Sequence, residues 1–188
     1  ELADKIRTGS IAYDLCRPLS AYGYYYSRAL AQKLVGSLLR AAPMLVFALL
    51  LPPGWRLCAP ASLPALGLGL TGLLLGLFCV CALDNLAMGI TLRTVDAKGV
   101  QALFSLVMMT FSGNILPLPL FPDSWQRAVT LLPYAQLLDA PIRLYTGEWA
   151  LFQAPRALLV QLLWTALLLG LGLLIWRRNE KEITVQGG

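Results

Sequence analysis

Few residues of this chain could carry out chemistry, and their spacing does not form an active site. The cysteines are Cys16, Cys58, Cys79 and Cys81, and the chain has no histidine. Cys79 and Cys81 are two residues apart on a predicted helix, about 200° around its axis, so they cannot share a metal ion. The lack of histidine removes the usual metal ligand and general base. We therefore predict neither a metal centre nor acid–base catalysis.

Motifs for nucleotide binding and hydrolysis are also missing from the sequence. The dipeptide Gly-Lys does not occur, so the chain has no P-loop. The motifs HExxH, GxSxG and CxxC are absent as well. We predict that the chain is not an enzyme and binds no cofactor of its own.

The composition places the chain in a membrane. Of its 188 residues, 57% are hydrophobic and 13% are charged, whereas soluble domains carry about 25% charged residues. The formal net charge is +5, but the Lys and Arg side chains cluster at the ends of apolar runs. That distribution is typical of membrane topology signals and not of nucleic-acid binding.

Four apolar stretches predict membrane-spanning helices, so the expected fold class is an all-α integral membrane bundle. They cover approximately residues 28–51, 62–83, 100–117 and 154–176. The last stretch contains Ala157 to Trp176, twenty residues that extend about 30 Å and cross a bilayer core. No acidic residue lies at the centre of a predicted span, where ion-coupled transport usually needs a carboxylate or an unwound ion site. Any active transport therefore draws its energy from elsewhere.

Residues 117–150 are too rich in proline for one continuous helix. Ser124–Leu132 and Tyr134–Tyr145 predict two short helices, neither long enough to cross a bilayer. We expect them to be re-entrant or interfacial helices on the outer side. The spans and this region form a transmembrane domain over 28–176.

Basic residues set the predicted orientation. Ten Lys and Arg side chains fall on the side of the N-terminus and four on the other side, with Arg40 inside a span. Residues 1–27 therefore predict a cytoplasmic interfacial segment, in which Tyr22 and Tyr24 to Tyr26 meet the headgroup region. Residues 177–188 predict a cytoplasmic tail, so both ends of the chain lie inside.

Two features within the spans have more than one interpretation. Gly69, Gly72 and Gly76 fall at i, i+3 and i+7, a pattern that lets another helix approach closely but also arises by chance in a Leu/Gly-rich span. Arg40 is the deepest cation, and Lys33 lies in the inner half of the same span. Arg40 either snorkels, contacts a neighbouring helix or takes part in a substrate path.

Three stretches resemble the permease subunit of type-2 ATP-binding-cassette (ABC) transporters, in the bacterial exporter branch near the daunorubicin and viologen export permeases. The first is IRTGSIAYDLCRPLS (Ile6 to Ser20). The second is FSGNILPLPLFPDSWQRAVTLLPYAQLLDAPIRLYTGE (Phe111 to Glu148). The third is the last span with its Arg177-Arg178 and TVQGG end. The similarity covers nearly all of the chain.

The resemblance implies a six-span bundle in the bacterial inner membrane, of which the four predicted spans correspond to the third to sixth and the first two would precede Glu1. It implies cytoplasmic ABC ATPase subunits that bind ATP and Mg, a second permease copy or paralogue, and an unknown exported substrate. It also implies an ATPase-coupling segment, made of Gly9, Ser10, Tyr13, Asp14, Leu15, Arg17 and Pro18. An outer gate is implied at Phe121, Pro122, Trp125, Pro133, Tyr134 and Tyr145.

The sequence therefore predicts the membrane subunit of an ATP-driven exporter, with two alternatives. A secondary transporter or channel would move its substrate without ATP, driven by an ion gradient. A non-transporting membrane scaffold would tolerate mutation of Asp14 and Arg17 without loss of any flux.

Overall fold

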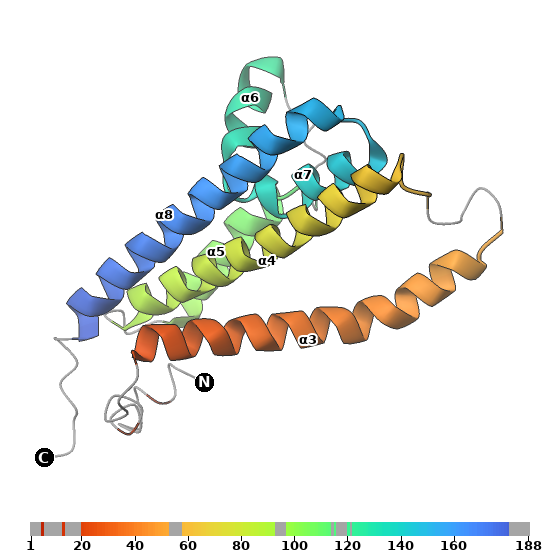
Figure 1. Cartoon of the computed structure of the whole chain (residues 1–188). Coiled ribbons are helices and arrows are strands. Elements are labelled where there is room, and N and C mark those ends of the chain that lie inside the picture. Colours follow the sequence, from red (N-terminus) through yellow and green to blue (C-terminus); the bar gives the residue numbers. More distant parts are fainter. Residues whose placement is uncertain are drawn as a thin grey trace, which may run out of the picture.

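The structure is a computed structural model, and the residues that it describes fold into helices without a strand. The structure describes residues 5, 13, 20–52, 58–92, 97–113, 115, 120 and 122–180. The helices are α3 (Ala21–Leu50), α4 (Leu63–Thr91), α5 (Ala97–Phe111), α6 (Asp123–Leu131), α7 (Ala135–Thr146) and α8 (Ala154–Glu180), with a 3₁₀ turn, η2, at Leu151–Gln153 (Figure 1).

Three of these helical segments are long and apolar enough to cross a membrane: Ala21–Leu50, Leu63–Thr91 and Leu151–Asn179. Each has 29 or 30 residues and therefore extends about 44 Å. The predicted fold class, an all-α polytopic membrane bundle, is confirmed. Helix α5 has 15 residues, about 22 Å, and is shorter than the span expected at 100–117. That span stays a prediction, because most of residues 114–119 lie outside the described residues.

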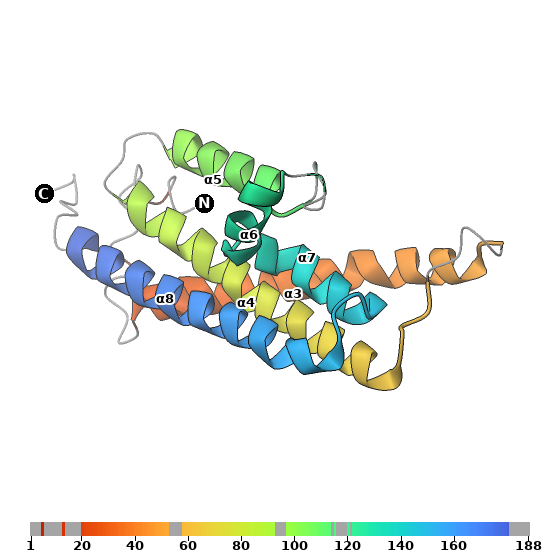
Figure 2. The same cartoon turned by 90° about the horizontal axis from the view of Figure 1, so that it is seen from above.

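Helix α4 occupies the centre of the bundle. Its start is fixed by Ser62, whose hydroxyl accepts a hydrogen bond from the Ala65 amide at 3.2 Å, and by Pro64 in the first turn. Helix α8 packs along one side of α4 and α7 packs on another, while α5 flanks the end near Thr91 (Figure 2). Helices α3, α5, α7 and α8 therefore all pack against α4.

Helix α3 begins at Ala21, seven residues before the expected start of its span. Tyr22 and Tyr25 lie in this additional N-terminal part of the helix and are buried against Trp176 of α8. Their ring centroids are 6.1 Å (Tyr22) and 5.6 Å (Tyr25) from that of Trp176. The Tyr22 hydroxyl also donates to the Leu169 carbonyl at 3.0 Å. These two tyrosines are therefore packing residues between helices, and their expected place at the lipid headgroups stays a prediction.

Helix α4 also continues beyond its expected end at residue 83, to Thr91. Asp84 and Asn85, which directly follow the predicted span at 62–83, lie inside the helix. Asn85 is 0% exposed and donates to the Tyr22 carbonyl at 3.2 Å, and Asp84 pairs with Lys33 of α3 at 2.8 Å. Both residues therefore contact α3 from inside α4.

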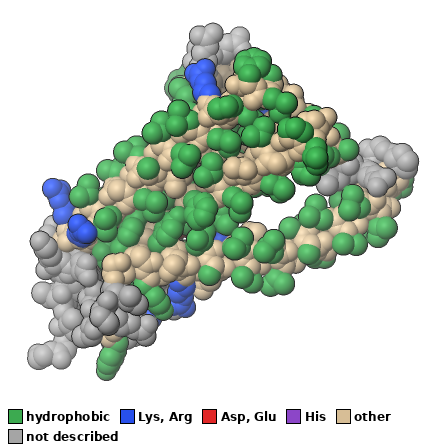
Figure 3. All heavy atoms as spheres, in the orientation of Figure 1, with side chains coloured by type: hydrophobic (Ala, Val, Ile, Leu, Met, Phe, Trp, Pro, Cys, Tyr) green, Lys and Arg blue, Asp and Glu red, His purple; other side chains and the backbone are tan. Residues whose placement is uncertain are grey.

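The C-terminal half of α3 lies apart from the other helices. Its apolar side chains, Phe47 and Leu50 among them, are exposed, and an opening separates it from α4 (Figure 3). Only the N-terminal half, near Tyr22 and Tyr25, is anchored.

The two short helices lie close to their expected bounds. Helix α6 covers Asp123–Leu131 and α7 covers Ala135–Thr146, with Pro133 between them. Helix α7 ends at Gly147, whose φ of 76° is the left-handed conformation that favours glycine as a helix cap. The chain then turns through η2 into α8.

Candidate functional site

The implied ATPase-coupling segment falls almost wholly outside the described residues. Of its members the structure describes Tyr13, whose side chain is 80% exposed. The others, Gly9, Ser10, Asp14, Leu15, Arg17 and Pro18, lie outside the described part of the chain. The coupling role stays a prediction.

The implied gate residues are spread over α6 and α7 and do not form one cluster. Pro122 precedes α6, Trp125 is 66% exposed, and Phe121 lies outside the described residues. Tyr134 and Tyr145 stand at opposite ends of α7, eleven residues or about 17 Å apart.

The gate residues of α7 contact different partners. Pro133 is buried before α7, and Tyr134 packs against the cluster around Cys79 and Leu137. Tyr145 donates to the Cys58 carbonyl at 2.8 Å. Tyr145 therefore fastens the end of α7 to the connection between α3 and α4.

Gly69, Gly72 and Gly76 lie on the face of α4 that meets α7. A Cβ atom added at Gly69 would be 3.0 Å from the Tyr145 Cβ, and one at Gly76 would be 3.0 Å from the Leu137 carbonyl oxygen. At Gly72 the nearest atoms belong to Pro141, at 3.4 Å. The two backbones approach so closely that side chains on this face would push α7 away.

A buried amide, Gln161 of α8, joins three elements. Its side-chain nitrogen donates to the Gln136 carbonyl of α7 and, at 3.2 Å, to the Gly72 carbonyl of α4. Gln136 in turn donates to the Thr130 carbonyl of α6 at 2.6 Å. This network was missed in the sequence, where Gln161 stands alone in an apolar run; an isolated amide in such a run is the available signal.

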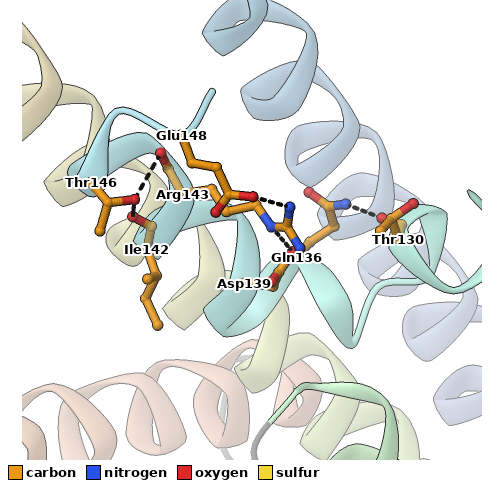
Figure 4. A network of polar contacts seen from close by, with 7 residues as sticks. All are labelled: Thr130, Gln136, Asp139, Ile142, Arg143, Thr146 and Glu148. Carbon is orange, nitrogen blue, oxygen red and sulfur yellow. Dashed lines mark hydrogen bonds and ion pairs between the residues drawn. The ribbon is translucent and has the colours of Figure 1, made fainter. Parts of the chain in front are cut away.

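Arg143 organises the C-terminal end of α7 (Figure 4). Its guanidinium donates to Asp139 and to Glu148, both at 2.7 Å, and lies over the Trp149 ring. Burial raises the pKa of the Asp139 carboxyl, an effect that the hydrogen bond and charge of Arg143 partly offset. The arrangement holds the turn after α7 against the helix.

A cleft of about 470 Å³ opens between α3, α4 and α5. Lys33 and Asp84 form their ion pair in its wall, and Arg40 lines it further along α3. The remaining lining is mixed, with Gln101 and Ser105 beside apolar side chains. This combination was not predicted, because nothing in the sequence pairs Asp84 of α4 with Lys33 of α3.

The comparison with known families decides what kind of protein has these helices. A family model described as "ABC-2 family transporter protein" matches residues 1–187. The chain belongs to the ABC-2 transporter family. No match was found among curated proteins or solved structures.

For this ABC-2 family chain, the family and the apolar helices agree on the main points. It is a multi-pass membrane protein and the permease component of a transporter. Helices α4, α7 and α8 form a tightly packed unit, and α3 is attached to that unit at one end.

Proposed function

We propose that this chain is the membrane-spanning subunit of an exporter driven by a separate ABC ATPase. The observation that carries the proposal is the family match over residues 1–187. The lack of a P-loop in the sequence supports a motor on another chain. The outward direction and the place near the daunorubicin and viologen export permeases follow from the resemblance of the three stretches described above.

The proposed topology puts both ends of the chain in the bacterial cytoplasm. The start of α3 and the ends of α4 and α8 lie at the same end of the bundle, as the packing of Tyr22 and Met88 near Trp176 requires. Arg177 and Arg178 follow at that end, which favours the cytoplasmic side of the inner membrane. Helix α5 is proposed as a fourth span and α6 and α7 as re-entrant helices on the outer side.

The proposed mechanism begins at the segment Gly9–Pro18, which precedes α3 in the chain. The ATPase contacts this segment, and its closure on ATP shifts the start of α3. Because α3 is anchored beside Tyr22 and Tyr25 and stands apart beyond, the shift changes its position against α4, α7 and α8. The substrate leaves between two permease copies or paralogues, past a gate formed by α6 and α7.

Purification of the full-length protein with its ABC ATPase tests this proposal. We expect the ATPase to co-purify and its hydrolysis to rise when the permease is present. Arg17→Ala should leave the complex assembled but make hydrolysis independent of the permease, whereas Leu174→Ala, on the exposed face of α8, should behave as wild type. If no ATPase binds, the proposal fails, and substrate flux driven by an ion gradient without ATP would establish a secondary transporter instead.

A further inference from the structure

Among the described residues that line the cleft between α3, α4 and α5, positive charge is in excess. Lys33 and Arg40 both line it and are seven residues apart, close to two helical turns, so they project from the same face of α3. Asp84 on α4 pairs with Lys33 at 2.8 Å. Within the described residues Arg40 has no ion pair. Two cations therefore face one carboxylate.

Arg40 stands where an unpaired charge is unfavourable. It lies ten residues, about 15 Å, from the nearer end of α3, and its neighbours Leu38, Leu39 and Met44 are exposed and apolar. A charge inside an apolar membrane segment is costly, and such residues usually mark a ligand or an ion path. The polar groups around Arg40 are those of the cleft.

The walls of the cleft offer two kinds of contact. Gln101 and Ser105 of α5 supply hydrogen-bonding groups, while Phe104, Met108 and Leu83 supply an apolar wall. A ligand that makes both the polar and the apolar contacts and neutralises the excess positive charge has an anionic headgroup and an apolar chain. A guanidinium binds carboxylate or phosphate through two parallel hydrogen bonds.

We propose that this cleft binds the anionic headgroup of an amphiphile, with a phosphate or carboxylate between Arg40 and Lys33 and the chain along Phe104 and Met108. Asp84 competes with the ligand for Lys33, so binding draws Lys33 away from Asp84. The inference takes α3 and α4 as membrane helices but does not depend on ATPase coupling. The amphiphile is either a bilayer lipid or a soluble molecule such as an alkyl phosphate.

Native mass spectrometry of the full-length protein in an uncharged detergent tests the site without any ATPase. The probes are phosphatidylglycerol, phosphatidylcholine with the same acyl chains, and dodecyl phosphate. We expect phosphatidylglycerol to bind more tightly than phosphatidylcholine. Arg40→Gln should weaken that binding about tenfold or more, as expected for a lost charge-assisted contact. Comparable affinity for dodecyl phosphate would assign the site to soluble amphiphiles, and a strong preference for the two-chain lipid would assign it to a bilayer lipid.

Two further variants separate ligand binding from a structural role. Asp84→Asn removes the competing carboxylate and should strengthen binding of the anionic probes, although it removes an ion pair. Arg156→Gln, an exposed cation remote from this cleft, should have no effect. Melting temperatures in the same detergent confirm that each variant is folded.

The proposal is overturned if Arg40→Gln binds the anionic probes like wild type, or if Asp84→Asn weakens binding as Arg40→Gln does. It is also overturned if a second protein copy fills the cleft. In that case a cysteine introduced by Ser105→Cys, in a variant without other cysteines, would cross-link to the neighbouring copy and the probes would not bind.

Discussion

At the scale of single residues, α4 and α7 approach each other closely where α4 has glycine, which has no side chain. Gly76 on α4 faces the Leu137 carbonyl of α7, and Gly67 on the same helix has no atom within 4 Å of an added Cβ. The two glycines differ in their surroundings and share one helix. Alanine substitutions at these two positions therefore separate the effect of close packing from the low intrinsic helix propensity of glycine.

Gly76→Ala should destabilise the protein, while Gly67→Ala should not. At Gly76 the new methyl group would lie 3.0 Å from the Leu137 carbonyl oxygen, so α7 must shift, at a cost of about 1–3 kcal/mol. At Gly67 alanine fits the open space and is favoured in a helix. Thermal unfolding in detergent measures both, and equal melting temperatures for the two variants would contradict the packing of α7 against α4.

At the scale of elements, α3 is attached to the bundle through its first turns. Tyr22 and Tyr25 bury against Trp176, which is 1% exposed, and Asn85 holds the Tyr22 carbonyl. Beyond Lys33 no side-chain hydrogen bond or ion pair joins the described part of α3 to that of α4. The attachment of α3 therefore depends on the aromatic and polar contacts of its N-terminal half.

Trp176→Ala should loosen the start of α3. Removal of a buried tryptophan costs about 3–5 kcal/mol, and much of that loss falls on the residues packed against it. We expect amide hydrogen exchange of residues 21–27 to rise about tenfold or more, with little change in α7. Leu174→Ala, an exposed position on the same helix, is the control, and the same rise in both variants would show that the contact is not the anchor.

At the scale of the whole molecule, the cysteines report on topology. Cys58 lies in the connection between α3 and α4 and is exposed, whereas Cys79 and Cys81 are buried within α4. In the proposed orientation this connection faces the outside of the cell. A thiol reagent that does not cross membranes can therefore tell the two sides apart.

A Cys16→Ser variant should react with an impermeant maleimide on intact cells. Cys58 is the expected target, so the additional change Cys58→Ser should abolish labelling. A cysteine at position 178, introduced by Arg178→Cys in that double variant, should react once the membrane is opened. Labelling of Cys58 that also requires an opened membrane would reverse the proposed orientation.

Hydropathy and proline content predicted much of the architecture. Long apolar runs predicted the helices α3, α4 and α8, and the prolines between residues 117 and 150 predicted two short helices, which the structure places at α6 and α7. These features depend on local composition, which can be read directly from a single sequence. Single residues such as Pro133 and Gly147 were enough to separate neighbouring helices.

The polar contacts between helices could not be predicted in the same way. Asp84 and Asn85 indicate the end of a span when only local hydropathy is considered. They lie inside α4, where Asp84 pairs with Lys33 and the Asn85 side-chain nitrogen donates to the Tyr22 carbonyl. Gln161 is likewise buried because its amide reaches two carbonyls on other helices. Such pairings depend on residues 25 to 89 positions away, and hydropathy carries no information about them.

The one-ended attachment of α3 makes it a lever. From Tyr25 to Leu50 it extends 25 residues, about 38 Å. A rotation of about 10° around the contact with Trp176 therefore moves the far end by roughly 7 Å, which is more than one helical turn. Such a rotation would turn a small displacement at the start of α3 into a large one at its far end, without requiring a change in the packing of α4, α7 and α8.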